Sequence, residues 1–324
     1  MGSLGLDFVA PGIVITDAPR FSYEKLGAYS GTSCAASNAA GAVACLLSGL
    51  KIEYSTKMIK FVLAKTAYLP KNRNKFEFGH GLIQIYDAFK YCQNHSKIDF
   101  NNKIPYPLPS AGGIHFMQND DEKNTVTERE INLSQFIEND EPSKDVIENC
   151  TLEISPKTTE NFIEFDGNNK FKIKIDTKNL EAGSLNFAEI LIMDSEIGSI
   201  YNIPINVIYV LKVTKTHNYS FEKEITLNYE NPYYLILYPY FESSTECKIT
   251  ITTLENSILD LCIKYMVRSE SEETVKILDF IPNVSTQTHT ISIEIKAFHE
   301  FCIFQKIGAL PFVVLNLEFN FISD

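Results

Sequence analysis

The residue best suited to chemistry is Ser33, which follows Gly31 and Thr32 and opens a run of small residues rich in alanine. Alanine is the strongest helix former, so the run predicts a helix that begins at the serine and stops near Ser48. The first N–H groups of a helix lack partners within it and lie at its positive end. Both properties favour the negative charge that develops when a hydroxyl attacks a carbonyl, and the backbone N–H of Ser33 can donate to that oxyanion. Ser33 is therefore a candidate nucleophile; the alternative is an ordinary core helix with a serine N-cap.

Segments on both sides of Ser33 predict the elements that must position it. Upstream, residues 6–13 predict a strand followed by a turn at Ala-Pro-Gly. Downstream, residues 56–69 carry apolar side chains at helical spacing. A glycine-containing strand segment at 78–84 and a further helix at 85–91 follow.

These motifs resemble the nucleophile region of subtilisin-like serine peptidases, and more narrowly the tripeptidyl-peptidase II family. The narrower resemblance rests on Ser37-Asn38-Ala39, on residues 47–51 and on residues 79–84, and it continues more weakly along the rest of the chain. It implies a serine peptidase that removes tripeptides from the free amino termini of oligopeptides, with Ser33 as catalytic residue and its N–H as an oxyanion donor. It implies no cofactor and no metal, and it implies self-assembly or association with full-length subunits.

The rest of the catalytic machinery is not found near Ser33. In the family order Asp and His precede the serine, whereas the first histidine here is His80, in the closing strand segment. The resemblance places the Asp, the His and the oxyanion Asn upstream of Met1. A serine without its base is protonated and weakly nucleophilic, and loss of the serine–histidine unit costs about 10⁶ in turnover. We therefore expect a peptidase fragment that is inactive alone, or alternatively a non-enzymatic interaction protein whose β-domains bind partner subunits.

The fold class expected is α/β, a partial subtilisin-like parallel-sheet domain, followed by all-β domains. A half-domain of this kind would leave sheet edges unpaired and a core face uncovered. We expect the subtilisin-like part at 1–95, a linker at 96–111, an immunoglobulin-like β-sandwich at 112–213 and a second sandwich at 214–324. The resemblance implies that the second sandwich is a galactose-binding-like jelly roll.

Strand patterns carry the β prediction. Short apolar or alternating runs are separated by turn residues, as a sandwich requires. The candidate strands are Leu152–Ser155, Phe171–Ile175, Tyr201–Val213, Phe221–Tyr229, Tyr233–Tyr238, Cys247–Thr252, Leu259–Val267, Thr290–Ile295 and Val313–Phe321. Tyrosines between 229 and 240 could form a carbohydrate-type binding face, but half-buried sandwich tyrosines are the commoner case.

Composition narrows the class of protein. The net charge is −12, which disfavours nucleic acid because phosphate contacts need clustered Lys and Arg. Residues 118–149 hold ten acids and three bases, a pattern usual for a solvated face or connector. The seven cysteines form no C-x-x-C pair, which favours free thiols in the cytoplasm over zinc or disulfides. No apolar run is long enough to span a membrane.

Overall fold

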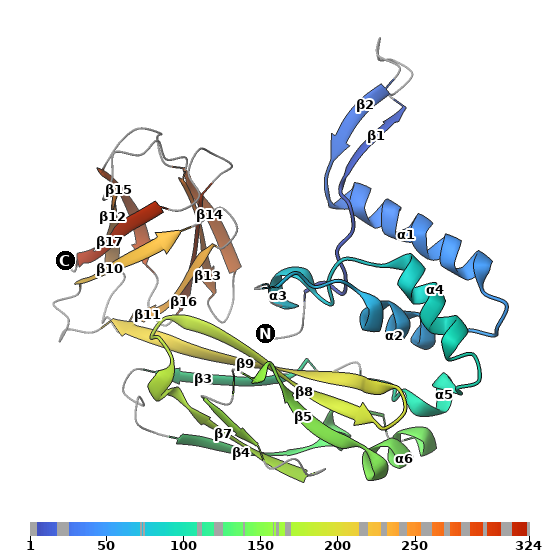
Figure 1. The fold of residues 1–324 in the computed structure, drawn as a ribbon. Helices are drawn as coiled ribbons and strands as arrows, with labels where there is room; N and C mark the ends of the chain where they lie inside the picture. Colours follow the sequence, from blue (N-terminus) through green and yellow to red (C-terminus); the bar gives the residue numbers. More distant parts are fainter. Residues whose placement is uncertain are drawn as a thin grey trace.

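The structure is a computed structural model of the 324-residue chain, and it has a helical part and two β-rich parts (Figure 1). It describes residues 5–17, 26–71, 73, 75–108, 112–119, 126–138, 140–157, 159, 162–165, 170–213, 220–227, 232–239, 245–253, 261–268, 273–279, 286–293, 297–305 and 313–322. This order of an α/β part followed by β parts is the predicted fold class.

The helical part begins with the antiparallel hairpin of β1 (Ile13–Asp17) and β2 (Leu26–Ser30). Five helices follow it: α1 (Thr32–Gly49), α2 (Thr56–Thr66), α3 (Lys75–Phe78), α4 (Ile85–Asn94) and α5 (Phe100–Lys103). Ser55 caps α2 by accepting a hydrogen bond from the Met58 N–H, and the apolar positions of α2 are buried as their spacing predicted. The helices predicted at the nucleophile, at 56–69 and at 85–91 are confirmed.

The first β part is a two-sheet sandwich. One sheet contains β3, β5, β8 and β9, and the other has the order β4-β7-β6. The elements are β3 (Ile114–Asn119), β4 (Val126–Asn132), η2 (Leu133–Gln135), α6 (Glu141–Asn149), β5 (Thr151–Ser155), β6 (Ile163–Phe165), β7 (Lys170–Asp176), η4 (Thr177–Asn179), β8 (Ser184–Asp194) and β9 (Gly198–Val213). Alternate residues of β8 and β9, such as Ile190 and Ile203, are fully buried against the second sheet.

The second β part is also a two-sheet sandwich. Four strands in the order β10-β17-β12-β15 face four in the order β14-β13-β16-β11. Their bounds are β10 (Ser220–Leu227), β11 (Tyr233–Pro239), β12 (Thr245–Thr253), β13 (Leu261–Arg268), β14 (Glu273–Asp279), β15 (Thr286–Ile293), β16 (Phe298–Gln305) and β17 (Val313–Ile322). A separate core lies between the sheets, with Phe301 and Phe319 packed edge-to-face at 5.3 Å.

The two β parts share hydrogen bonding through β9. Residues 211–213 of β9 pair in parallel with residues 237–239 of β11, so one eight-stranded sheet runs from the first sandwich into the second. Figure 1 shows the end of β9 beside β11 at the base of the C-terminal sandwich. Val213, the last residue before the predicted boundary at 213/214, is also the last residue of β9, the strand that links the two sandwiches.

Several elements differ from the predictions or were not predicted. Helix α6 lies in the acidic run, where Asp140 caps it by accepting a hydrogen bond from the Ser143 N–H. Strand β4 also lies in that run, so much of it is ordered structure with a charged outer face. Near the nucleophile, the parallel pairing within the described residues is a single bridge between Val9 and Leu82.

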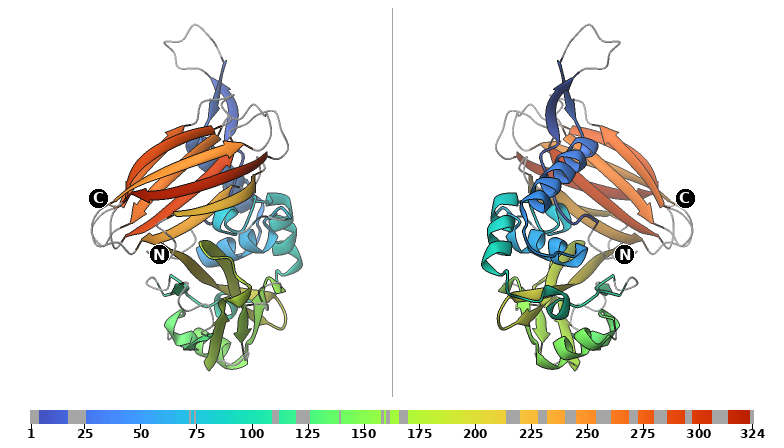
Figure 2. Two further views of the ribbon diagram at one scale, coloured as in Figure 1. Left: turned by 90° about the vertical axis from the view of Figure 1, so that its left-hand side faces the viewer. Right: turned by 90° about the vertical axis from the view of Figure 1, so that its right-hand side faces the viewer.

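The hairpin and α1 present exposed apolar side chains. Ile13 and Ile15 are both 76% exposed on one face of the hairpin, and Leu26 on the same face is 59% exposed. Within α1 only Leu46 is buried. The hairpin projects from the molecule in Figure 1 and in both views of Figure 2. Among the described residues no helix combines the length and apolarity needed to span a membrane.

The contrast between β9 and the hairpin can be tested with one substitution at two sites. Ile203 is fully buried and Ile13 is mostly exposed. We expect Ile203→Ala to lower the free energy of unfolding by about 2–5 kcal/mol, because it leaves a cavity in the core. Ile13→Ala should change it by less than about 0.5 kcal/mol. Urea unfolding followed by circular dichroism measures both; equal effects would contradict the exposed hairpin.

Candidate active site

The start of α1 places Ser33 as the second residue of the helix, directly after Thr32. Gly31 is the N-cap, and its carbonyl accepts from the N–H groups of Cys34 and Ala35 at 3.1 and 3.2 Å. The Ser33 N–H has no acceptor among the described residues. An unpaired N–H at the positive end of an 18-residue helix can stabilise an oxyanion.

The Ser33 side chain is exposed, and its hydroxyl makes no hydrogen bond within the described part of the chain. Ser37, one turn later, donates its hydroxyl hydrogen to the Ser33 carbonyl at 3.0 Å. This bond joins the Ser37 side chain to the first turn of α1. The geometry supplies an accessible hydroxyl beside a free N–H donor, and among the described residues no side chain is hydrogen-bonded to that hydroxyl as a base would be.

The segment before the hairpin fixes where α1 begins. The Gly31 N–H donates to the Gly12 carbonyl at 2.9 Å, and the Asn38 amide donates to the Pro11 carbonyl at 2.7 Å. A Cβ on Gly12 would lie 3.0 Å from the Gly31 oxygen, so the close approach of the two segments favours glycine there. The Ala-Pro-Gly turn predicted from the sequence therefore contacts the first turns of the nucleophile helix.

The closing segment in turn holds residues 7–9. The His80 N–H donates to the Asp7 carbonyl at 2.7 Å, and the Val9 N–H donates to the Gly81 carbonyl at 3.0 Å. Gly79 and Gly81 have φ of 57° and 114°, and a Cβ on either would lie 2.4 Å from a backbone oxygen. The glycines of this motif are thus required by both backbone conformation and space.

His80 is part of this packing and is not a base for Ser33. Its ring contacts Phe8 at a centroid distance of 5.5 Å. Burial, together with the nearby Lys75, lowers the pKa of His80 from 6.5 to about 4, while Asp7 opposes the shift. The ring is therefore neutral at pH 7. No hydrogen bond joins it to Ser33 among the described residues.

Among the side chains that the structure describes, the carboxylate upstream of Ser33 is that of Asp7, and it is paired elsewhere. Asp7 forms an exposed ion pair with Lys60 at 2.9 Å. Asp17 ends β1 opposite Leu26 in the register of the hairpin. Among the described residues no three His, Cys, Asp or Glu side chains gather as a metal site would need.

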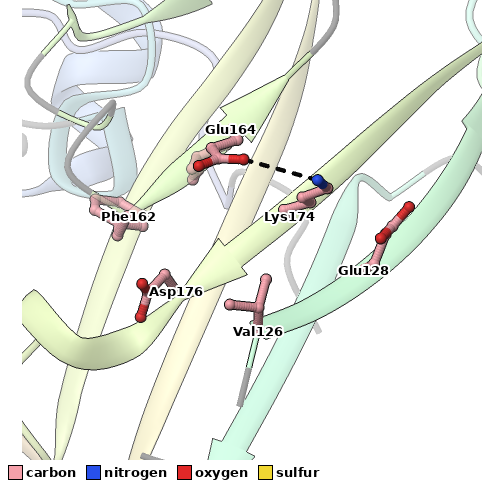
Figure 3. A pocket seen from close by; sticks show the side chains of 7 residues that line it. Val126, Glu128, Phe162, Glu164, Lys174 and Asp176 are labelled. Carbon is pink, nitrogen blue, oxygen red and sulfur yellow. Dashed lines mark ion pairs between the residues drawn. The ribbon is translucent and has the colours of Figure 1, made fainter. Parts of the chain in front are cut away.

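A cavity of about 400 Å³ lies elsewhere, on the three-stranded sheet β4-β7-β6. Figure 3 shows Glu128, Glu164 and Asp176 around Lys174, whose amine lies 3.9 Å from the Glu164 carboxylate. Its lining contains no serine, histidine or cysteine, so it lacks the groups that a serine peptidase site needs.

The tyrosines of β11 do not form one binding face. Tyr233 packs against the core of the second sandwich, whereas Tyr234 points to the opposite side of the sheet and is 37% exposed. Tyr238 stacks obliquely on Phe298 at 4.9 Å. Tyr229 and Tyr240 lie outside the described residues.

Comparison with known proteins identifies relatives of this chain. Residues 1–81 match the subtilase family. The chain is 36% identical over 124 residues to a tripeptidyl-peptidase 2 of Drosophila melanogaster, covering 36% of this chain and 8% of that protein. It is 25% identical over 234 residues to one of Oryza sativa subsp. japonica, covering 64% and 17%. The chain thus spans less than a fifth of these relatives.

The fold of almost the whole chain is also found in a solved structure. A crystal structure of tripeptidyl peptidase 2 superposes with a TM-score of 0.68 at 19% identity, covering 94% of this chain and 29% of that one. The match includes the β-rich parts, where the sequence motifs were only suggestive. The resemblance to tripeptidyl-peptidase II is therefore confirmed.

Gly81 in the closing turn and Gly41 in α1 provide a matched pair for mutation. We expect Gly81→Ala to destabilise the chain by roughly 1–3 kcal/mol, because the backbone has φ of 114° and the methyl would clash with the Tyr68 oxygen. Gly41→Ala, in the middle of α1 with nothing within 4 Å, should stabilise it by about 0.5–1 kcal/mol. Thermal unfolding measures both; a tolerated Gly81→Ala would contradict the packing of this turn.

The neutral His80 predicts a pH dependence of stability. The unfolded chain binds a proton at this residue below about pH 6.5, whereas the folded chain binds it only near pH 4. Its contribution to stability is therefore constant above pH 6.5 and is lost as the pH falls from 6.5 toward 4. We expect an NMR titration to give a pKa near 4, and His80→Gln to remove this part of the pH dependence. A pKa near 6.5 would show that the ring is solvated.

Proposed function

We propose that this chain, a relative of tripeptidyl-peptidase 2, is the nucleophile-bearing part of a subtilisin-like serine peptidase, with Ser33 as the attacking residue. The observation that carries the proposal is the exposed Ser33 hydroxyl at the N-terminus of α1, beside its own unpaired N–H. The match of residues 1–81 to the subtilase family supports it. The substrate would be an oligopeptide with a free amino terminus, cleaved after its third residue.

The chemistry assigned to this chain is limited to what its residues can do. The Ser33 oxygen would add to the scissile carbonyl carbon while its proton passes to a base supplied from outside the described residues. The Ser33 N–H would donate to the resulting oxyanion. Collapse of this intermediate would release the amine, which takes up the proton, and leave an ester on Ser33. Attack by water on the ester would then release the tripeptide and restore the hydroxyl.

We further propose that the 324-residue chain is inactive by itself. His80, the first histidine in the sequence, is neutral and packed on Phe8, and Asp7 pairs with Lys60. Within the described part of the chain, the Ser33 hydroxyl therefore has no group to accept its proton. The exposed apolar side chains of the hairpin also suit a domain that is completed by further polypeptide.

The proposed organisation is a subtilisin-like segment at 1–95, a linker at 96–111, an immunoglobulin-like sandwich at 112–213 and a galactose-binding-like sandwich at 214–324. The separate core of the second sandwich, which begins at Val213, supports the last boundary. The β parts would serve in self-assembly or in binding full-length subunits. All seven cysteines are free thiols, which supports a cytoplasmic location.

The second candidate is a non-enzymatic interaction protein, favoured by the same exposed hairpin and by α1, in which only Leu46 is buried. Here the peptidase segment would be a remnant, and the β parts would bind a partner subunit. The two candidates differ in whether Ser33 ever becomes reactive.

A fluorophosphonate probe separates these candidates, because it reacts only with an activated serine. We expect no adduct on the 324-residue chain, and a stoichiometric adduct at Ser33 when upstream in-frame sequence with an Asp-x-Gly and a Gly-x-His motif is added. Mass spectrometry locates the adduct, and Ser33→Ala is the matched control. Labelling of the short chain would overturn its inactivity. Co-assembly with a full-length subunit without any labelling would favour the interaction protein.

A further inference from the structure

A buried ion pair joins the helical part to the first sandwich. The Lys75 amine, at the start of α3, lies 2.7 and 2.8 Å from the two carboxylate oxygens of Glu189 on β8. The two side chains are only 16% and 8% exposed, although the residues are 114 positions apart in the chain. A buried charge is stable only when it is paired and hydrogen-bonded, so the two groups depend on each other.

The surroundings complete this contact. The side-chain amide nitrogen of Asn202 donates to a Glu189 carboxylate oxygen at 3.1 Å. The Ser199 hydroxyl donates to the side-chain oxygen of Asn202 at 2.6 Å. Beside the pair, Phe76 packs edge-on against Phe187 at 4.8 Å. Phe187 and Glu189 lie on the same face of β8, because strand residues alternate. The side chains of Lys75 and Phe76, the first two residues of α3, therefore both contact β8.

Helix α3 needs this anchor. It has only four residues, and a helix of one turn is not stable by its own hydrogen bonds. The Gly79 N–H donates to the Lys75 carbonyl, so the anchored residue also begins the turn at 79–81. That turn is the one that holds Asp7 and Val9 by backbone hydrogen bonds.

We propose that Glu189 is a positioning residue for Ser33. Glu189 fixes Lys75, the short α3 fixes the turn at 79–81, and the turn fixes residues 7–9. Residues 11 and 12 of the same segment then hold Gly31 and Asn38 at the start of α1. The role as positioning residue rests on the proposed function of Ser33, whereas the structural coupling does not.

A second set of ion pairs, at the end of β8, provides the control. Lys103 of α5 contacts Asp194 and Glu196, at the end of β8 and just after it, both at 3.0 Å. This contact also joins the helical part to the first sandwich, but α5 makes no hydrogen bond to the closing turn among the described residues. If the coupling belongs to Glu189, loss of the Lys103 contact will not reach Ser33.

Backbone amide exchange on the full chain tests the coupling, since a path of contacts is evidence only when a coupling is measured. We expect Glu189→Gln and Lys75→Met each to speed exchange at Val9, His80 and Gly31 by roughly tenfold or more, because local opening follows the loss of a buried partner. Exchange in β12 and β17 of the second sandwich should stay unchanged, which shows that the chain is folded. Lys103→Met should leave all three amides unchanged.

The outcomes are distinct. Unchanged exchange at Val9 and Gly31 in both variants would overturn the proposal. So would an equal increase in the Lys103→Met variant, because it would show general loosening of the interface. If Glu189→Gln fails to fold, Lys75→Met carries the test alone, and exchange at Val9 that is unchanged in that variant overturns the proposal. Failure of the fluorophosphonate test would refute the role of Ser33 while leaving the exchange result intact.

Discussion

Strand β9 is the element on which the arrangement of the whole chain depends. It pairs antiparallel with β8 over residues 198–209, and its other edge is occupied first by β3 and then by β11. Its alternate residues face the core of the first sandwich, and its last residue, Val213, belongs to the core of the second. A shift of one residue would turn every one of these side chains to the wrong face, so one register fixes both sandwiches.

The same sheet also positions the helical part. The core-facing residues of β8, such as Ile190, pack against β4-β7-β6, and the residues between them present Phe187 and Glu189 to α3. The β8 strand is thus covered on both faces. At the other end of the sheet, Gly183 has φ of 85° and its carbonyl accepts from the Ile236 N–H at 2.8 Å. The three parts of the chain therefore meet on one continuous sheet, although their sequences suggest separate domains.

Local features of the fold could be predicted because local physics decides them. The alanine run after Ser33, the capping serine before α2 and the apolar alternation of β9 each determine their own element. Helix α6 was not predicted, because it lies in an acidic run that is typical of a connector, although Asp140 is a recognisable N-cap. No periodicity marks which of 41 acidic residues will meet Lys75, because that contact joins residues 114 positions apart. The candidate nucleophile could therefore be proposed from sequence, and the residue proposed to position it could not.

Helix α1 shows why recognising a nucleophile is easier than recognising a working site. Its small residues suit close packing on several sides, yet the buried residue of α1, Leu46, lies near its C-terminal end, where Gly49 leaves room for Phe89. Its alanines favour the helix by local propensity, and the N–H of Ser33 is free because it lies in the first turn of that helix. A base cannot be kept in the same way. Its position relative to the hydroxyl is a tertiary distance of about 3 Å, which only the packing of further elements against α1 can set.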